Sequence, residues 1–431
     1  MTNRRHAPIL AFALLCGACG PAAESIAVTA FTGATVWDGS GAAALNNATI
    51  YVAEGRIHSV LAGGDTPPAV EVVEEIDLGG QYVTPGLINA HGHVSGLWAD
   101  DGIDDELERI RGDLALFGRY GVTTINSLGD GDAVIAVRDQ ATATDPRARL
   151  LAAGPVIADV TAEDARASAE ANADARVDWL KVRVDDNLGT VEKMPWAAVE
   201  AVLTVGQERD LPVATHLFYL ADAKRLLSMG SGMIAHSVRD VEVDTDFIEQ
   251  LRASGVCYVP TLTREVSTFV YGARPDFFDD AFFLRDAHPG QMAMVSDPDF
   301  MARMAASPSA AGYRVALEQA MENLKILSDA GLPVAMGTDA GPAGRFPGYF
   351  EHLELWMMVD AGLTPEQALL SATSVAASCL DRDDLGTLTA GAWADFLVFE
   401  EDPLSDIRAT ATLERVYIAG NRLPNPTEDS P

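Results

Sequence analysis

The chain has 431 residues, 48% of them hydrophobic and 22% charged, a composition that supports a large buried core. Its 63 acidic side chains outnumber the 30 basic ones, and the formal net charge is -33. Such a charge repels nucleic-acid phosphates and anionic membrane surfaces, so the composition argues against nucleic acid as a partner.

The first 19 residues are typical of an export signal. Arg4 and Arg5 precede an apolar run, Ile9–Leu15, that is too short to span a bilayer. Small residues then lead to Cys19, as in a bacterial lipoprotein signal, although Cys16 stands where such signals usually have leucine. An ordinary signal peptide is the alternative. Both interpretations predict an exported, periplasmic protein, and the first adds a lipid anchor at Cys19.

Both ends of the remaining chain carry short β-like runs that are broken by Gly, Asn and Asp and show no helical period. These runs occupy residues 26–83 and 386–424. Because the two segments flank one long segment of different texture, we expect both chain ends to build one small β-sandwich domain.

Residues 84–385 alternate short apolar runs with amphipathic stretches, which is typical of βαβ units and a parallel sheet. Eight such units predict an α/β fold, a closed (β/α)8 TIM barrel. Helices are expected at residues 162–173, 195–210, 221–230 and 244–255. The expected strands end at His91, Leu128, Gly154, Val182, His216, His236, Leu262 and Asp339.

Three features stand outside this alternation. A long stretch after the seventh strand, residues 263–308, is expected to be irregular and to shape the mouth of the site or to pack on the surface. The apolar residues of YFEHLELWMMVDAG, starting at Tyr349, are expected to be exposed and favour a homo-oligomer. Cys257 and Cys379 lie in a strand-like and a helical run, and nothing in the sequence indicates a disulfide framework.

Metal-ligating side chains recur at the carboxyl ends of the expected strands, where barrel enzymes place their active sites. His91 and His93 are two residues apart, so both rings point to the same side of a strand and can hold one cation. His216, His236 and Asp339 end the fifth, sixth and eighth strands. Each residue alone has a structural alternative, such as a hydrogen-bonded core histidine or a turn, and the set as a whole favours a metal site.

Lys181 lies inside the fourth expected strand, between Leu180 and Val182. An unpaired ammonium in an apolar wall is strongly disfavoured, so some group must neutralise it. The alternative is a side chain that points outward between strand and helix and keeps its ammonium in water.

The order HxH, Lys, His, His, Asp resembles that of the amidohydrolase superfamily, in particular its binuclear prolidase-like and imidazolonepropionase-like branch. The resemblance covers nearly the whole mature chain and implies two divalent metal ions, with zinc the expected metal. It also implies that carbon dioxide carboxylates Lys181 to a carbamate that bridges them. Carried over by position, one metal is held by His91, His93 and Asp339, and the other by His216 and His236.

Two metals about 3.5 to 4 Å apart lower the pKa of a bridging water enough to supply hydroxide at neutral pH. Asp339 is then expected to act as a catalytic base as well as a ligand, and to pass the proton to the leaving amine. We therefore expect a small-molecule substrate with an amide-like C–N bond. A lactonase, esterase or phosphotriesterase is the alternative on the same centre. A non-catalytic exported binding protein is the alternative of another class, although the full ligand set argues against it.

Residues that follow barrel strands are candidates for substrate contact. They are Tyr219, Arg264, Arg345 and His352, with Arg183 as a further candidate. In the dipeptide-cleaving relatives that this chain resembles, a Tyr two residues after the strand-five histidine and a later Arg hold the substrate carboxylate. Here Phe218 and Lys224 stand near those positions, which argues against dipeptides.

Overall fold

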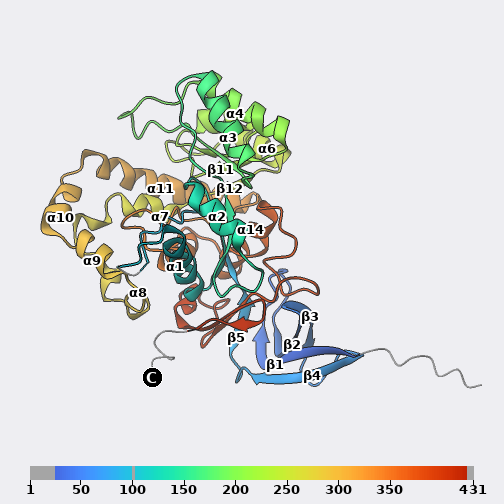
Figure 1. The fold of residues 1–431 in the computed structure, drawn as a ribbon. Helices are drawn as coiled ribbons and strands as arrows, with labels where there is room; N and C mark the ends of the chain where they lie inside the picture. The colour runs from blue at the N-terminus through green and yellow to red at the C-terminus, as the bar shows by residue number, and fades with distance from the viewer. Residues whose placement is uncertain (1–24, 100–101, 425–431) are drawn as a thin grey trace, which may run out of the picture.

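The computed structural model describes residues 25–99 and 102–424 (Figure 1). The expected export signal, with Cys19, lies outside these residues. Within the described part of the chain, no helix is both long and apolar enough to cross a membrane. In Figure 1 the strands nearest the N-terminus, drawn in blue, lie at the lower right. The green helices of the central segment lie above them.

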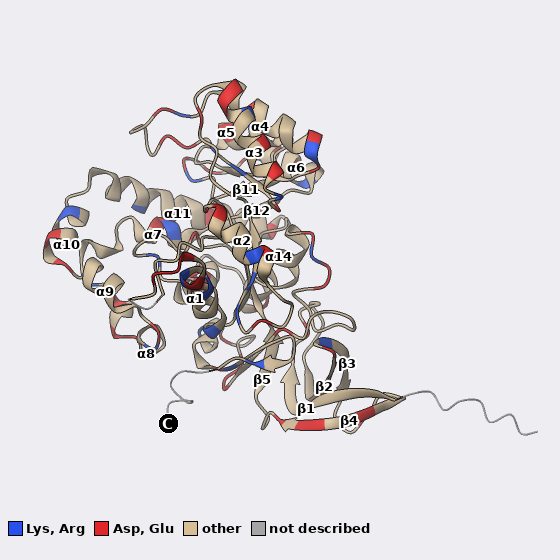
Figure 2. Cartoon of the chain, viewed as in Figure 1, with Lys and Arg blue, Asp and Glu red and all other residues tan. Residues whose placement is uncertain are grey.

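The two chain ends meet in one eight-stranded sheet, as predicted. Its strand order is β15-β14-β13-β5-β1-β2-β3, and β4 pairs with β1 in parallel. The rings of Phe31, Phe396 and Tyr417, from both ends, pack with centroids 4.5 to 5.0 Å apart and close the core of this β-sandwich domain. The strands are β1 (Ile26–Val36), β2 (Leu45–Ala53), β3 (Arg56–Ala62), β4 (Val70–Asp77), β5 (Tyr82–Pro85), β13 (Phe396–Phe399), β14 (Leu413–Ile418) and β15 (Asn421–Arg422). The acidic residues of β4 are exposed. They give the red segments along this strand in Figure 2.

The central segment forms two parallel sheets that lie in sequence around a common core. The first sheet contains β6 (Leu87–Gly92), β7 (Val122–Ser127) and β8 (Arg149–Ala152). The second contains β9 (Leu180–Arg183), β10 (Val213–His216), β11 (Met233–Ala235) and β12 (Cys257–Val259). A bridge between Ile157 and Val182 joins the sheets. Nearly every strand residue is buried, as expected for parallel strands that helices cover.

The eighth expected strand, which ends at Asp339, is not a regular strand. A bridge from Val334 to Tyr258 ties it to β12, and Ala90 on β6 donates its backbone N–H to Met336 at 2.9 Å. The segment thus fills the gap between β12 and β6. Its regular pairing stops well before Asp339, because Met336 donates its backbone N–H to Ser371 at 2.8 Å and not to a strand. Asp339 itself has a left-handed backbone, with φ of 57°, which an extended strand excludes.

The helices cover the strands at the predicted places. They are α1 (Glu106–Arg119), α2 (Asp132–Gln140), α3 (Ala162–Asp174), α4 (Trp196–Arg209), α5 (Leu220–Ser228), α6 (Thr245–Ser254), α11 (Pro308–Asp329), α12 (Tyr349–Asp360), α13 (Pro365–Ser371) and α14 (Ser374–Cys379). Local capping explains their bounds: Asp244 accepts the N–H of Phe247 at the start of α6, and Gly255, with φ of 66°, ends it. The four helices expected between residues 162 and 255 are α3 to α6.

The stretch 263–308 is not irregular, contrary to expectation. It folds into short helices, α7 (Leu262–Ser267), α8 (Ala281–Leu284), α9 (Pro289–Val295) and α10 (Pro298–Ala305), with 3-10 turns η1 (Val270–Gly272) and η2 (Asp276–Asp279). The side chains of Asp280, His288 and Asp297 each accept a backbone N–H at the start of the next helix. These local caps, with prolines in the first turn of α9 and α10, give helices that are too short for a periodic pattern.

The helix expected to expose apolar side chains, α12, is almost entirely buried, so that expectation is wrong. Its buried residues include Phe350, Leu355, Trp356 and Met358. Phe277, on η2, packs against Phe350 with ring centroids 6.2 Å apart, because the short helices of the stretch 263–308 fold over α12. The helix α12 therefore offers no argument for a homo-oligomer.

Cys257 and Cys379 form a disulfide, which contradicts the expectation of no such bond. The bond joins β12 to α14 across 122 residues, with the two Cα atoms 5.8 Å apart. Sequence spacing could not indicate it, because the two residues become neighbours only when the eighth segment closes the sheet. It ties together the elements on either side of that irregular segment.

A Cys379→Ser variant is expected to lose about 4 kcal/mol of unfolding free energy, because the disulfide closes a loop of more than one hundred residues in the unfolded chain. Urea unfolding of the oxidised proteins measures the difference. The same measurement in reductant should bring the wild type down to the variant. A wild type that is equally stable with and without reductant would contradict the prediction.

Candidate functional site

The six residues with the expected metal-ligand order converge at the carboxyl ends of the strands. His91 comes from β6, Lys181 from β9 and His216 from β10, while His93 directly follows β6 and His236 directly follows β11. Asp339 ends the eighth segment and lies beside β6 because Asp339 donates its backbone N–H to the carbonyl of His91 at 2.7 Å. The scattered sequence positions thus become one buried cluster.

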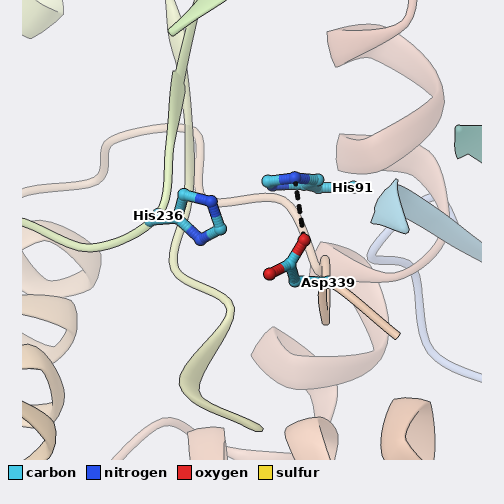
Figure 3. A group of neighbouring side chains, drawn as sticks. All are labelled: His91, His236 and Asp339. Atoms are coloured by element: carbon cyan, nitrogen blue, oxygen red, sulfur yellow. Dashed lines mark ion pairs between the residues drawn. The ribbon is translucent and has the colours of Figure 1, made fainter. Parts of the chain in front are cut away.

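Three members of this cluster bring their ligand atoms within 4.8 Å of one another: His91, His236 and Asp339 (Figure 3). Asp339 Oδ1 lies 3.4 Å from His91 Nε2 and 2.8 Å from His93 Nε2. The ring of His236 lies 4.5 Å from that of His91 and 4.0 Å from that of His216, measured between centroids.

In each of the four imidazoles except His91, one ring nitrogen has a partner outside the cluster. His93 Nδ1 lies 3.4 Å from Asp130, and His216 Nε2 donates to Asp185 at 3.0 Å. His236 Nδ1 shares a hydrogen bond with Thr261 at 2.7 Å. Such partners select the tautomer and orient the ring of a metal ligand.

The donor atoms fit a cation. The Nε2 atom of His236 is buried and has no hydrogen-bond partner among the described residues. Burial lowers the pKa of His91 and His236, and lowers that of His216 to about 3, so these rings are neutral and offer lone pairs. A cluster of neutral imidazoles around one carboxylate is the donor set that zinc and similar divalent metals accept.

Two charged groups remain within the cluster. Burial lowers the pKa of His93, but Asp130 and Asp339 outweigh it and raise the value to about 9. Burial alone would raise the pKa of Asp339, but Arg345 and His93 outweigh this effect and hold the pKa well below its usual range. Asp339 is therefore an ionised carboxylate at neutral pH.

Lys181 points into the cluster rather than outward, which excludes the alternative in which its ammonium reaches water. It is only 2% exposed, and its Nζ lies 3.2 Å from His91 Nε2. No carboxylate of the described residues forms an ion pair with it, and burial lowers its pKa to about 7. The lysine is thus partly a neutral amine near neutral pH.

The backbone around the cluster is held in unusual conformations. His236, Thr261 and Asp339 all have positive φ, at 79°, 53° and 57°, where side chains other than glycine are disfavoured. Such outliers gather at functional sites, where the surrounding structure holds them in place. The glycine that follows in GTDAG, Gly341, has no room for a side chain, because a Cβ there would lie 2.2 Å from the carbonyl oxygen of His93.

The cluster opens into a cavity of about 460 Å³. One part of its wall is apolar and includes Leu128, Val156 and Ala158. Arginines line another part: Arg183, Arg264 and Arg345. The cavity therefore combines the imidazole cluster with apolar and cationic walls, and its volume suits a small molecule.

Two of the four residues expected to contact substrate, Arg264 and Arg345, line this cavity. Tyr219 and His352 do not. The hydroxyl of Tyr219 donates to Asp186 at 2.9 Å, and Lys193 lies over its ring. His352 is fully buried in α12, where its Nε2 lies 2.7 Å from the carbonyl oxygen of Tyr120.

The burial of His352 predicts a loss of stability in acid. Burial lowers its pKa to about 4, whereas the unfolded side chain titrates near 6.5, so only the unfolded state takes up a proton between these values. The contribution of His352 to the free energy of unfolding is complete above pH 6.5 and should fall by about 2 kcal/mol between pH 7 and pH 5. Urea unfolding of wild type and His352→Gln at both pH values measures this, and the variant should lose less stability on acidification. Equal losses would count against it.

The sequence interpretation missed the residues that support the ligands. Asp130 follows β7 by three residues and Asp185 follows β9 by two, so both stand at the same rim as the imidazoles. Their position after a strand was a usable signal. Asn89 and Glu351 carried none: Asn89 Nδ2 donates to Glu351 at 2.6 Å, across residues far apart in the chain.

Comparisons with known proteins agree with this architecture. The model of the amidohydrolase family matches residues 82–423. The imidazolonepropionase of Deinococcus radiodurans is 27% identical over 401 residues, which cover 88% of this chain and 92% of that protein. A 42% identical match to the imidazolonepropionase of Streptomyces avermitilis spans 81 residues, 19% of each chain.

Solved structures share the fold over almost the whole length. A crystal structure from Bifidobacterium longum, described as a candidate prolidase, superposes with a TM-score of 0.74 and 26% identity, covering 93% of this chain and 96% of that one. A crystal structure of a Xaa-Pro dipeptidase with bound methionine superposes with a TM-score of 0.71 and 21% identity, covering 92% of this chain and 99% of that one. The family match confirms the resemblance that the ligand order predicted, and the TIM-barrel neighbours confirm the fold class. This chain is an enzyme of the amidohydrolase family.

Proposed function

We propose that the enzyme hydrolyses an amide-like C–N bond in a small molecule that carries a carboxylate, with two divalent metal ions in the imidazole cluster. The observation that carries the proposal is the convergence of four histidines, Lys181 and Asp339 in one cluster, of which all but His236 line the cavity. The family match supports hydrolysis, and the names of the relatives, imidazolonepropionase and prolidase, support a C–N bond.

The ligand assignment is part of the proposal. His91, His93 and Asp339 would hold one metal, and His216 and His236 the other. Lys181 would join the two sets as a carbamate, formed when its neutral amine adds to carbon dioxide and releases one proton. The buried amine has a lowered pKa and no carboxylate partner in the part of the chain that the structure describes, which supports this modification. Bound metals of this kind lower the pKa of a water and polarise a carbonyl.

The side chains of the chain then divide the remaining work. Asp339, kept ionised by Arg345, would accept the proton of the attacking water and deliver it to the leaving nitrogen as the C–N bond breaks. The outer partners Asp130 and Asp185 keep the imidazoles in place. The products are a carboxylic acid and an amine.

The arginine wall supports a substrate with a carboxylate. The Nε atoms of Arg183 and Arg264 are buried without a hydrogen-bond partner among the described residues. A guanidinium fork matches a carboxylate, and an unsatisfied buried donor is costly until a ligand accepts from it. An anionic substrate group satisfies this wall.

A hydrolysis screen of the zinc-loaded full chain tests the proposal. N-acyl amino acids and cyclic amides with a carboxylate should turn over faster than dipeptides, lactones, esters or phosphotriesters. Elemental analysis should find about two metals per chain, and chelators should remove metal and activity together. A metal-free barrel that binds small molecules without turnover would support a binding protein instead. Preferred turnover of lactones or phosphotriesters would overturn the amide assignment.

We further propose that the protein is exported to the periplasm and anchored there by a lipid on Cys19. The signal-like segment and the Cys257–Cys379 disulfide support this, because such bonds persist in oxidising compartments. In a bacterial host, the chain should fractionate with membranes, and Cys19→Ser should release it. A cytoplasmic wild-type protein would overturn the proposal.

A further inference from the structure

A buried chain of alternating charges runs behind the site. Its centre is Glu265 on α7, whose side chain is 1% exposed. Arg239 Nε lies 3.1 Å from Glu265 Oε1, and Arg264 Nη1 lies 3.1 Å from both carboxylate oxygens. One carboxylate thus faces two guanidinium groups, of which Arg239 is fully buried and Arg264 only 8% exposed.

One arm of this network leads to the imidazole cluster. Arg239 Nη2 lies 3.8 Å from Asp185, and Asp185 accepts the Nε2 proton of His216 at 3.0 Å. Arg239 is anchored by donating to the backbone carbonyl of Leu217 at 2.9 Å, which directly follows His216. Whatever orients Arg239 therefore also orients the carboxylate behind His216.

The other arm leads to the substrate wall. Arg264 lines the cavity, and its guanidinium lies 4.9 Å above the ring of Tyr313. Glu265 is the carboxylate that pairs with Arg264 within the described residues. Because buried charges without a partner are strongly destabilised, Glu265 decides where the guanidinium of Arg264 can rest.

We propose that Glu265 is a positioning residue that serves both halves of the site at once: through Arg239 and Asp185 it orients His216 toward a bound metal, and through Arg264 it presents a guanidinium to the substrate carboxylate. The inference rests on the proposed function for its substrate half. The metal half depends only on the donor cluster. The charges balance, since two carboxylates, Asp185 and Glu265, face two arginines in one buried row.

Glu265→Gln removes the charge and keeps the shape. Competition between the full chain, stripped of metal, and a chromophoric chelator for zinc alone measures the first arm, and zinc affinity should fall roughly 10- to 100-fold. Steady-state kinetics on an N-acyl amino acid measures the second arm. KM should rise roughly 10-fold or more for the free acid but not for its carboxamide, which lacks the anion.

The chain offers a matched control. Glu354 is an equally buried glutamate that holds the start of α7, where it accepts the backbone N–H groups of Leu262 and Thr263 at 2.7 and 2.8 Å. Among residues 25–99 and 102–424 it pairs with no arginine. Glu354→Gln should change stability without changing zinc affinity or the preference for the free acid. Arg264→Met should raise KM for the free acid and leave zinc affinity unchanged.

The outcomes separate the positioning role from the proposed function. The inference would be overturned if Glu265→Gln and Glu354→Gln had equal zinc affinity. It would also be overturned if the enzyme hydrolysed the free acid and Glu265→Gln left its KM unchanged. If no substrate is hydrolysed, the proposed function fails and the zinc measurement still decides the positioning role. If the Gln variant does not fold, Glu265→Asp, which withdraws the charge by one methylene, replaces it. Wild-type zinc affinity and KM in that variant would overturn the inference.

Discussion

Asp339→Asn is expected to lower kcat by about a thousandfold or more, because an amide cannot accept the proton that a general base takes up. Asp339 Oδ1 lies 2.8 Å from His93 Nε2 and 3.4 Å from His91 Nε2, close to both histidines of the HxH motif. Asparagine fills the same space but also loses the charge that Arg345 faces. Steady-state kinetics on the substrate found in the hydrolysis screen, with circular dichroism to show folding, measures the effect.

Asp384→Asn is the matched control for this substitution. Asp384 also pairs with an arginine, Arg382 at 2.9 Å, but it lies in the link to the β-sandwich domain and outside the cavity. Its kcat should stay within about twofold of the wild type, as expected for a surface position away from the chemistry. If Asp339→Asn kept wild-type kcat with the control, the catalytic base would have to be another group.

Lys181→Ala should reduce zinc affinity by about a hundredfold or more, which exceeds the usual effect of removing a partner outside the ligand shell. The reason is that Lys181, which is 2% exposed and lies beside His91, would supply the carbamate that joins the two proposed sets of metal ligands. A binuclear centre holds about two metals per chain, and elemental analysis of the dialysed variant should find fewer. Turnover should fall with the metal.

Lys193→Ala provides the comparison, since Lys193 pairs with Asp222 at a partly exposed site and does not line the cavity. It should retain its metal and kcat. A Lys181→Ala variant that keeps both metals and full turnover would show that the lysine is only a buried cation. Added short carboxylic acids, which can enter the space left by the side chain, should restore part of the metal content.

Much of the architecture was readable in the sequence because it depends on local patterns. Parallel strands that helices cover on the outside must be apolar along their whole length, and the first seven apolar runs fold as expected, from β6 to β12. The ligand positions followed from the same pattern, since His91 and His216 end short apolar runs. Each carboxyl end of a parallel strand meets the same rim.

The errors have a different origin. The eighth segment carries a strand-like sequence, but Val334 makes a single bridge to β12 and the N–H of Met336 goes to Ser371. The apolar residues of α12 are buried because η2 and α8 pack over this helix. The periodicity of α12 itself gives no sign of this packing. The short helices between Leu262 and Ala305 depend on single capping side chains.

By itself the sequence determined the fold class, the two-ended β-sandwich and the set of side chains that could hold metal, because each depends on residue type and period along one stretch of chain. Only the tertiary structure decided which groups stand behind those ligands, that Cys257 meets Cys379, and that His352 and Tyr219 turn away from the cavity. Contacts between residues far apart in the chain depend on how elements pack in three dimensions, and local patterns do not record that packing.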